Sequence, residues 1–235
     1  SVDEDNNPVT DGGGESVHFV YDTRLTLNTS FSGEDLLKTR LRSGNFNNSP
    51  FSAETDTVER PAALETAYSS ADSVQVDRLY YQFPIGESLT ATIGAIVRQD
   101  DMLAVWPSSY PSSSILDVLT YAGAPGTYNL ALGAGAGISY TKDAFNASLT
   151  YIAKEGNKAS EGGLFAEDCP DDLTAQIAWV GDNWTIAAAY TTSDEESDDT
   201  DAWAFNGTWD PSRDSVSGGI GLPSVSLGFG FENND

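Results

Sequence analysis

The stretch from Asp22 to Asn45, DTRLTLNTSFSGEDLLKTRLRSGN, holds two alternating runs joined by the polar turn Ser32-Gly33-Glu34-Asp35. One parity is apolar and carries Leu25, Leu27, Phe31, Leu37 and Leu41. The other parity carries Arg24, Thr26, Asn28, Ser30, Lys38, Arg40 and Arg42. Successive side chains of a strand point to opposite faces, so the stretch predicts a β-hairpin with one apolar and one cationic face. A soluble sheet turns the apolar face to a core, whereas a membrane barrel turns it to lipid and lines its lumen with the polar face.

Composition excludes several classes of protein. The chain has 235 residues and a net charge of −25, with 11 basic residues, which is too few for a phosphate-binding face, so nucleic acid is not an expected partner. One cysteine, Cys169, and one histidine, His18, give neither an intrachain disulfide nor a His/Cys metal cluster. No apolar run reaches the roughly 18 to 20 residues of a spanning helix, but barrel strands need only about 9 to 11 alternating residues.

The rest of the chain continues the alternation. Residues 1–16 contain five acids and no base and predict an exposed acidic loop or tail. Residues 17–235 predict an all-β, antiparallel segment of about eleven strands, beginning near Val17 and including a short strand near 62–69. Residues 114–121 are the best helical candidate. In the run 89–98, Ile93, Ala95 and Val97 share the apolar parity.

Connections alternate between short turns and long polar loops, which is typical of outer-membrane barrels. Aromatic residues follow the same rhythm. Those near the short turns are Phe31, Phe83, Tyr140, Phe145, Trp179 and Trp184, and those near the long loops include Tyr190 and Trp203. Two belts of amphipathic rings are expected at the two interfaces of a bilayer.

Four segments resemble a known family. They are VYDTRLTLNTSFSGEDLLKTRLRSGNFNNSPF (20–51), VDRLYYQFPIGESLTATIGA (76–95), GAGAGISYT (133–141) and PSVSLGFGFEN (223–233). These residues resemble the cyanobacterial outer-membrane porins, the SLH-domain, OprB-like carbohydrate-selective or iron uptake porin family. The resemblance implies a trimeric β-barrel in the outer membrane that passes sugars, iron or other inorganic ions.

The resemblance covers the barrel portion of that family. Its members carry an SLH domain and a coiled coil that reach the peptidoglycan, and the sequence contains neither. An odd strand number is unusual for a bacterial single-chain barrel. We therefore expect a partial barrel, with strands missing at both ends, and contact with peptidoglycan only through the absent SLH domain.

The strongest functional signal is a predicted basic wall. Six of the eleven basic residues fall on one parity of four strands: Arg24, Lys38, Arg40, Arg42, Arg78 and Arg98. In a narrow lumen of lower dielectric such a wall attracts anions more strongly than in bulk water. The alternative is that these residues form structural ion pairs with Asp22, Asp77, Asp100 or Asp101, and both interpretations are compatible.

The connection from Gln99 to Tyr128 is about thirty residues long, which favours a functional loop. If it folds into the lumen, Asp100, Asp101 and Asp117 would face the cations across a constriction. The neighbouring glycines Gly133, Gly135 and Gly137 would leave room for it. The alternative is an external flap.

Other sites are weaker. The acidic run Asp194–Asp201 suggests divalent cation binding, but its spacing fits no EF-hand and a solvated loop is favoured. No catalytic constellation or phosphate loop is present, so we expect neither an enzyme nor a bound cofactor or metal.

The sequence therefore predicts an outer-membrane porin for passive diffusion of small hydrophilic solutes and ions. The alternative is a secreted acidic β-sandwich or jelly-roll carbohydrate-binding module. It differs in where the apolar faces lie, because a sandwich buries them between two layers.

Overall fold

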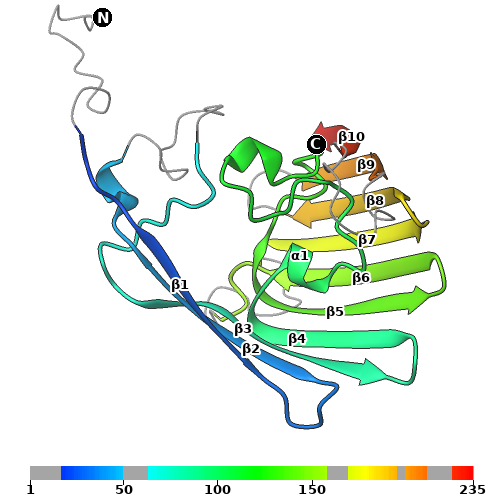
Figure 1. Ribbon diagram of the computed structural model, residues 1–235, viewed down its shortest axis with the longest axis horizontal. Helices are drawn as coiled ribbons and strands as arrows, with labels where there is room; N and C mark the ends of the chain where they lie inside the picture. The colour runs from blue at the N-terminus through cyan, green and yellow to red at the C-terminus, as the bar shows by residue number, and fades with distance from the viewer. Residues whose placement is uncertain (1–16, 50–62, 158–168, 195–198, 211–223, 235) are drawn as a thin grey trace, which may run out of the picture.

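The computed structural model describes residues 17–49, 63–157, 169–194, 199–210 and 224–234. These residues form one ten-stranded antiparallel sheet in which every strand pairs with its neighbours in sequence (Figure 1). The strands are β1 (Asp22–Thr29), β2 (Leu36–Gly44), β3 (Gln75–Ile85), β4 (Leu89–Arg98), β5 (Leu132–Lys142), β6 (Phe145–Ala153), β7 (Asp171–Val180), β8 (Trp184–Asp194), β9 (Asp199–Trp209) and β10 (Val225–Asn234). The expectation of an all-β antiparallel fold is confirmed.

Helical structure is limited to three short pieces among the described residues. These are α1 (Gln99–Met102) and the 3₁₀ turns η1 (Phe46–Asn48) and η2 (Asp117–Leu119). The helix predicted at 114–121 shrinks to η2, while α1 lies where no helix was predicted. Of the helices described, none has the length and apolar character to cross a membrane.

Two predictions about strands were wrong. The described residues contain ten strands and not eleven, because the segment near 62–69 makes only the isolated bridges Asn45↔Ser69 and Leu64↔Leu116. Its backbone bonds instead to residues 99–131, which we call the interior loop: Glu65 N–H donates to the Ile115 carbonyl at 3.0 Å. The first strand begins at Asp22 and not near Val17.

The sheet curves around α1 and its flanking loops but does not close (Figure 1). β1 and β10 lie at opposite edges, and each pairs with a single strand. The register shifts between Arg40 and Leu41, between Leu79 and Tyr80, and between Gly94 and Val97, in three successive ladders. Such bulges bend a sheet and redirect its side chains. The last of them turns Val97, predicted for the apolar parity, into the buried interior.

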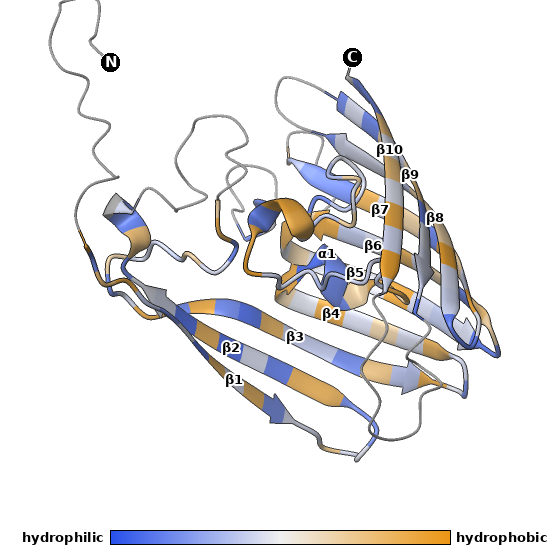
Figure 2. Ribbon diagram, turned by 45° about the horizontal axis from the view of Figure 1, so that its top comes forward, coloured by the Kyte–Doolittle hydropathy of each residue, from blue (hydrophilic) through white to orange (hydrophobic). Residues whose placement is uncertain are grey.

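The apolar parity of most strands faces outward and is uncovered. Figure 2 shows hydrophobic and hydrophilic residues alternating along the strands. Leu27 on β1, Ile93 on β4 and Phe229 on β10 are 52%, 59% and 62% exposed. Among the described residues, buried apolar side chains form small clusters on the concave side, such as Tyr80, Val97, Met102, Ala131 and Ile152. The hydrophobic surface of the described residues is therefore mostly on the outside of the sheet.

Candidate functional site

The candidate site is on the concave face of β1–β4, where the chain leaves β4 and enters α1. We call the charged residues there the inner cluster: Asp22, Arg24, Lys38, Arg40, Arg42, Glu65, Asp77, Arg78, Arg98, Asp100 and Asp101. Register shifts in the β3–β4 and β4–β5 ladders lie close to this point. All six basic residues predicted for one wall belong to the cluster, and each forms an ion pair.

Asp101 of α1 joins the interior loop to β2 and β3. Its carboxylate accepts hydrogen bonds from Lys38 Nζ at 3.2 Å, from Arg78 Nε at 2.7 Å and from the Tyr80 hydroxyl at 2.9 Å. The Asp101 carbonyl accepts a further bond from Gln82 Nε2 at 2.9 Å. Asp101 thus holds α1 against the wall through both side chain and backbone.

Asp100 makes a second attachment. Arg98 Nε and Nη2 donate to its two oxygens at 2.6 and 2.8 Å, a bidentate pair, and the Ser112 hydroxyl donates to the same carboxylate. Burial alone would raise the pKa of Asp100, but the hydrogen bonds and charge of Arg98 outweigh burial and hold the pKa below its usual value. Arg98 Nη1 also donates to Glu65 at 2.9 Å. Glu65 was not predicted, since an isolated Glu in a polar stretch gives no pattern.

On β1 to β3, basic residues lie opposite one another in register, with Arg24 beside Arg42 and Arg40 beside Arg78. Acids placed between them relieve the repulsion. Asp22 accepts from Arg24 and Arg42 at 3.1 and 2.6 Å, and Asp77 pairs with Arg40. The predicted structural pairing with Asp22, Asp77, Asp100 and Asp101 is therefore present.

The pairing is uneven in exposure. The Arg24 side chain is 21% exposed and its partner Asp22 only 1%, while Arg40 is 17% exposed and its partner Asp77 only 4%. Acids of β1 and β3 lie beneath the cations they pair with. On β1 and β2 the face that meets the interior therefore presents guanidinium and ammonium groups, even though each is paired. On β3 and β4, Arg78 and Arg98 are no more exposed than their acidic partners.

The interior loop, residues 99–131, then runs over the polar face of the sheet. Met102 packs against β5, where a Cβ on Gly137 would come within 3.0 Å of the Met102 side chain. At the start of the loop, Gln99 Nε2 donates to the Thr127 carbonyl at 2.9 Å and to Thr174 Oγ1 of β7 at 2.7 Å. Thr191 of β8 donates to the same carbonyl at 2.8 Å. The glycine face predicted to leave room for the loop contacts it in this way at Gly137.

The loop also reaches the opposite edge of the sheet. Asn206 Nδ2 of β9 donates to the Ala122 carbonyl at 2.7 Å, and a Cβ on Gly228 of β10 would lie 2.1 Å from that oxygen. Burial raises the pKa of Tyr128, packed on this part of the sheet, to about 12. The loop is fixed at both ends and lies inside the curve of the sheet, not outside it.

Asp117, the third predicted loop acid, does not belong to the inner cluster. Its carboxylate accepts from the Tyr121 hydroxyl at 3.1 and 3.2 Å. Burial, followed by the charge of Asp117, raises the pKa of Tyr121 to about 12. Asp117 thus stabilises the loop through a contact between two of the loop's own residues.

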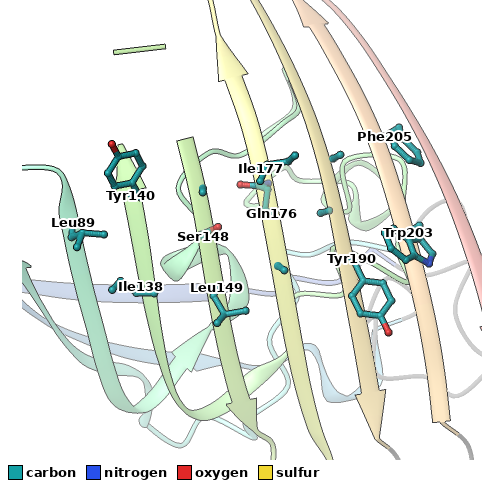
Figure 3. A pocket seen from close by; sticks show the side chains of 14 residues that line it. Leu89, Ile138, Tyr140, Ser148, Leu149, Gln176, Ile177, Tyr190, Trp203 and Phe205 are labelled. Atoms are coloured by element: carbon teal, nitrogen blue, oxygen red, sulfur yellow. The ribbon is translucent and has the colours of Figure 1, made fainter. Parts of the chain in front are cut away.

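The predicted aromatics lie on the outer face or in the turns. Rings contact in series near the short turns, with Phe31 against Tyr81, Tyr81 against Phe83, Tyr140 against Phe145, and Phe145 against Trp179. Trp184 pairs in register with Trp209 at the same end, and the Tyr190 and Trp203 rings are 4.5 Å apart farther along the strands. Between them is an open apolar hollow of about 590 Å³, with Ile138, Leu149, Ile177 and Phe205 in its lining (Figure 3).

The described residues contain no group of three or more His, Cys, Asp or Glu side chains that could hold a metal ion. Part of the acidic run Asp194–Asp201, residues 195–198, lies outside the described residues, as does the predicted tail 1–16.

Comparison with known proteins gives a distant relative. No protein-family model matches the chain, and no solved structure matches it. The chain is 29% identical over 210 residues to an uncharacterized protein, sll0772, of Synechocystis sp. (strain ATCC 27184 / PCC 6803 / Kazusa). The match covers 84% of this chain and 36% of that relative, so the chain spans about a third of the relative's length.

Proposed function

We propose that the chain is part of an outer-membrane porin, a β-barrel through which small hydrophilic solutes and inorganic ions diffuse passively. The proposal requires that further strands complete the sheet, because unpaired backbone groups at the edges of β1 and β10 are costly in lipid. Trimer formation and attachment to peptidoglycan follow from the family resemblance and are part of the same proposal.

One observation carries it: the hydropathy of the sheet is inverted relative to a soluble domain. Large apolar side chains are exposed on the outer face, and polar side chains such as Thr150, Thr174 and Gln176 are buried on the concave face. Soluble monomers rarely leave so continuous an apolar surface uncovered. Lipid would cover the outer face, with the aromatic series near the interfaces.

The interior would then filter solutes by size and charge. The interior loop occupies part of the space inside the curve and would narrow the channel. The inner cluster contributes six cations and five acids, with the cations of β1 and β2 more exposed than their acids. Coulomb attraction to a passing anion is about 1 kcal/mol at 4 Å in water and several-fold larger at lower dielectric. We therefore expect the channel to favour anions.

The alternative, a secreted β-sandwich that binds carbohydrate, requires a second layer over the apolar face. Within the described ranges the strands form one sheet, and its outer face carries exposed Leu27, Ile93 and Phe229. This arrangement favours the porin proposal over the sandwich.

The deciding experiment combines fractionation with conductance of the full-length protein. The porin should partition with outer membranes, need detergent for purification, and give steps of ionic current in planar bilayers. Reversal potentials in a salt gradient should indicate anion preference, which replacement of Arg40 and Arg42 by Ser should reduce. A protein that purifies without detergent and gives no current would refute the proposal.

A further inference from the structure

We propose that Arg24, Lys38 and Arg40 form a binding site for a small tetrahedral oxyanion, such as phosphate or sulfate. The site lies on the concave face of the β1–β2 hairpin. The inference rests on the proposed function and names the class of solute that the basic wall would favour.

The strand register places Arg40 between Arg24 and Lys38 on one face of the hairpin. Arg24 pairs with Arg42, Thr26 with Arg40, and Asn28 with Lys38, so Arg40 is diagonal to Arg24 and two residues from Lys38 on one face. Alternate residues of a strand, and diagonal neighbours on paired strands, are about 7 Å apart. Arg24 and Lys38 are each one such step from Arg40, and the long side chains of Arg and Lys span one step, so both can reach an ion bound at Arg40.

Each of the three residues has at least one N–H donor that makes no hydrogen bond to a described residue. Arg40 donates through Nε to Asp77, and neither of its Nη atoms donates to any described residue. Arg24 uses Nη2 for Asp22 and the Glu65 carbonyl, while its Nε is buried without a hydrogen-bond partner in the described structure. Lys38 donates to Tyr80 and Asp101, which leaves the third proton of its ammonium group.

Buried acids hold the guanidinium groups of the site in place and leave the side that faces the interior open. Asp22 and Asp77 are almost fully buried and contact the guanidinium groups from below. Six cations against five acids leave the inner cluster with one net positive charge, on a chain whose total is −25. A ligand of opposite charge is therefore attracted to this point of the interior.

A multidentate oxyanion fits these donors better than chloride does. Guanidinium groups hold oxyanions through directed N–H···O bonds, and a tetrahedral ion offers acceptors to several donors at once. Chloride has no such directionality and gains only the Coulomb attraction. The site faces away from the apolar surface, so an anion free in solution reaches it, whereas a lipid headgroup in a bilayer over the outer face does not.

Titration of the detergent-solubilised full-length protein with inorganic phosphate tests the site by calorimetry. We expect saturable binding that sulfate displaces and chloride at equal ionic strength does not. R40Q should raise the dissociation constant at least about tenfold, because it removes charged hydrogen bonds. Lys142, exposed at the end of β5, supplies the matched control, and K142Q should leave the constant within about twofold.

If R40Q does not fold, K38Q provides the same test, since Asp101 keeps Arg78 and Tyr80 as partners. Three results would each overturn the oxyanion site. They are an absence of saturable phosphate binding, an equal loss of phosphate affinity in the site variant and in K142Q, and displacement of phosphate by chloride as readily as by sulfate. Binding is measured without a current, so the two proposals fail separately. Ionic current without phosphate binding refutes only the oxyanion site, and binding without current refutes only the porin.

Discussion

Replacing Gly228 by alanine should detach the interior loop from β10. The added Cβ would lie 2.1 Å from the Ala122 carbonyl oxygen and 2.7 Å from Asn206 Nδ2. The first of these is a backbone atom, which cannot swing aside as the end of a side chain can. The loop or the strand must therefore move.

The size of the effect follows from these contacts. Overpacking of this kind costs about 1 to 3 kcal/mol. Moving the Ala122 carbonyl also weakens its hydrogen bond from Asn206, a net contribution of about 1 kcal/mol. We expect G228A to lower the free energy of unfolding by roughly 2 to 4 kcal/mol.

Gly207 on β9 supplies the matched control, because a Cβ there meets nothing within 4 Å. G207A should be neutral, or stabilising by up to about 1 kcal/mol, since alanine loses less backbone entropy than glycine on folding. Both variants are compared by denaturant unfolding in detergent and by chymotrypsin cleavage after Tyr121 and Tyr128. Cleavage there reports release of the loop, since Tyr128 is fully buried.

The expected difference is faster cleavage and lower stability in G228A alone. Equal stability and equal cleavage in the two variants would refute the conclusion that contact with β10 fixes the loop.

Three further outcomes are expected. D101N should lower the free energy of unfolding by roughly 3 kcal/mol, because buried Arg78 loses an ionic partner, whereas D117N should lower it little. Equal unfolding midpoints of the two variants would contradict this. Hydrogen bonds from Tyr81 and Ser32 hold the pKa of Asp35 well below its ordinary 3.8, so the stability that Asp35 contributes is present above about pH 4 and lost as the pH falls further. D35N should flatten the dependence of the unfolding free energy on pH in that range, and an unchanged dependence would exclude the effect. I177R, on the outer face, should make the free energy of folding into bilayers less favourable by about 2 to 4 kcal/mol, whereas E87R in the exposed β3–β4 turn should change it little. Similar changes in the two variants would argue against lipid contact.

Much of the fold was predictable because strand alternation is a local property. The β1–β2 hairpin, its turn and its two faces follow from a few residues of period two, and the register pairs Leu25 with Leu41 and Arg24 with Arg42. The prediction failed at Val97, where a bulge shifts the parity. It also failed near 62–69, where the predicted short strand bonds to the interior loop and does not join the sheet.

The sequence predicted which basic residues form the candidate site, but it predicted their contacts only in part. The basic residues share a parity, so their common face follows from the sequence. Their pairing with Asp100 and Asp101 depends on how the chain turns after Arg98. Glu65 and the contact of Ala122 with Gly228 join residues far apart in the chain, and neither leaves a local pattern.

The sequence by itself determined an antiparallel sheet with an apolar and a charged face, because side-chain direction in a strand depends only on odd or even position. Tertiary structure decided which of those faces is covered, since alternation is the same in a soluble sheet and in a barrel. It also decided that the interior loop crosses the polar face, because a long connection can fold inward or outward until distant contacts select one.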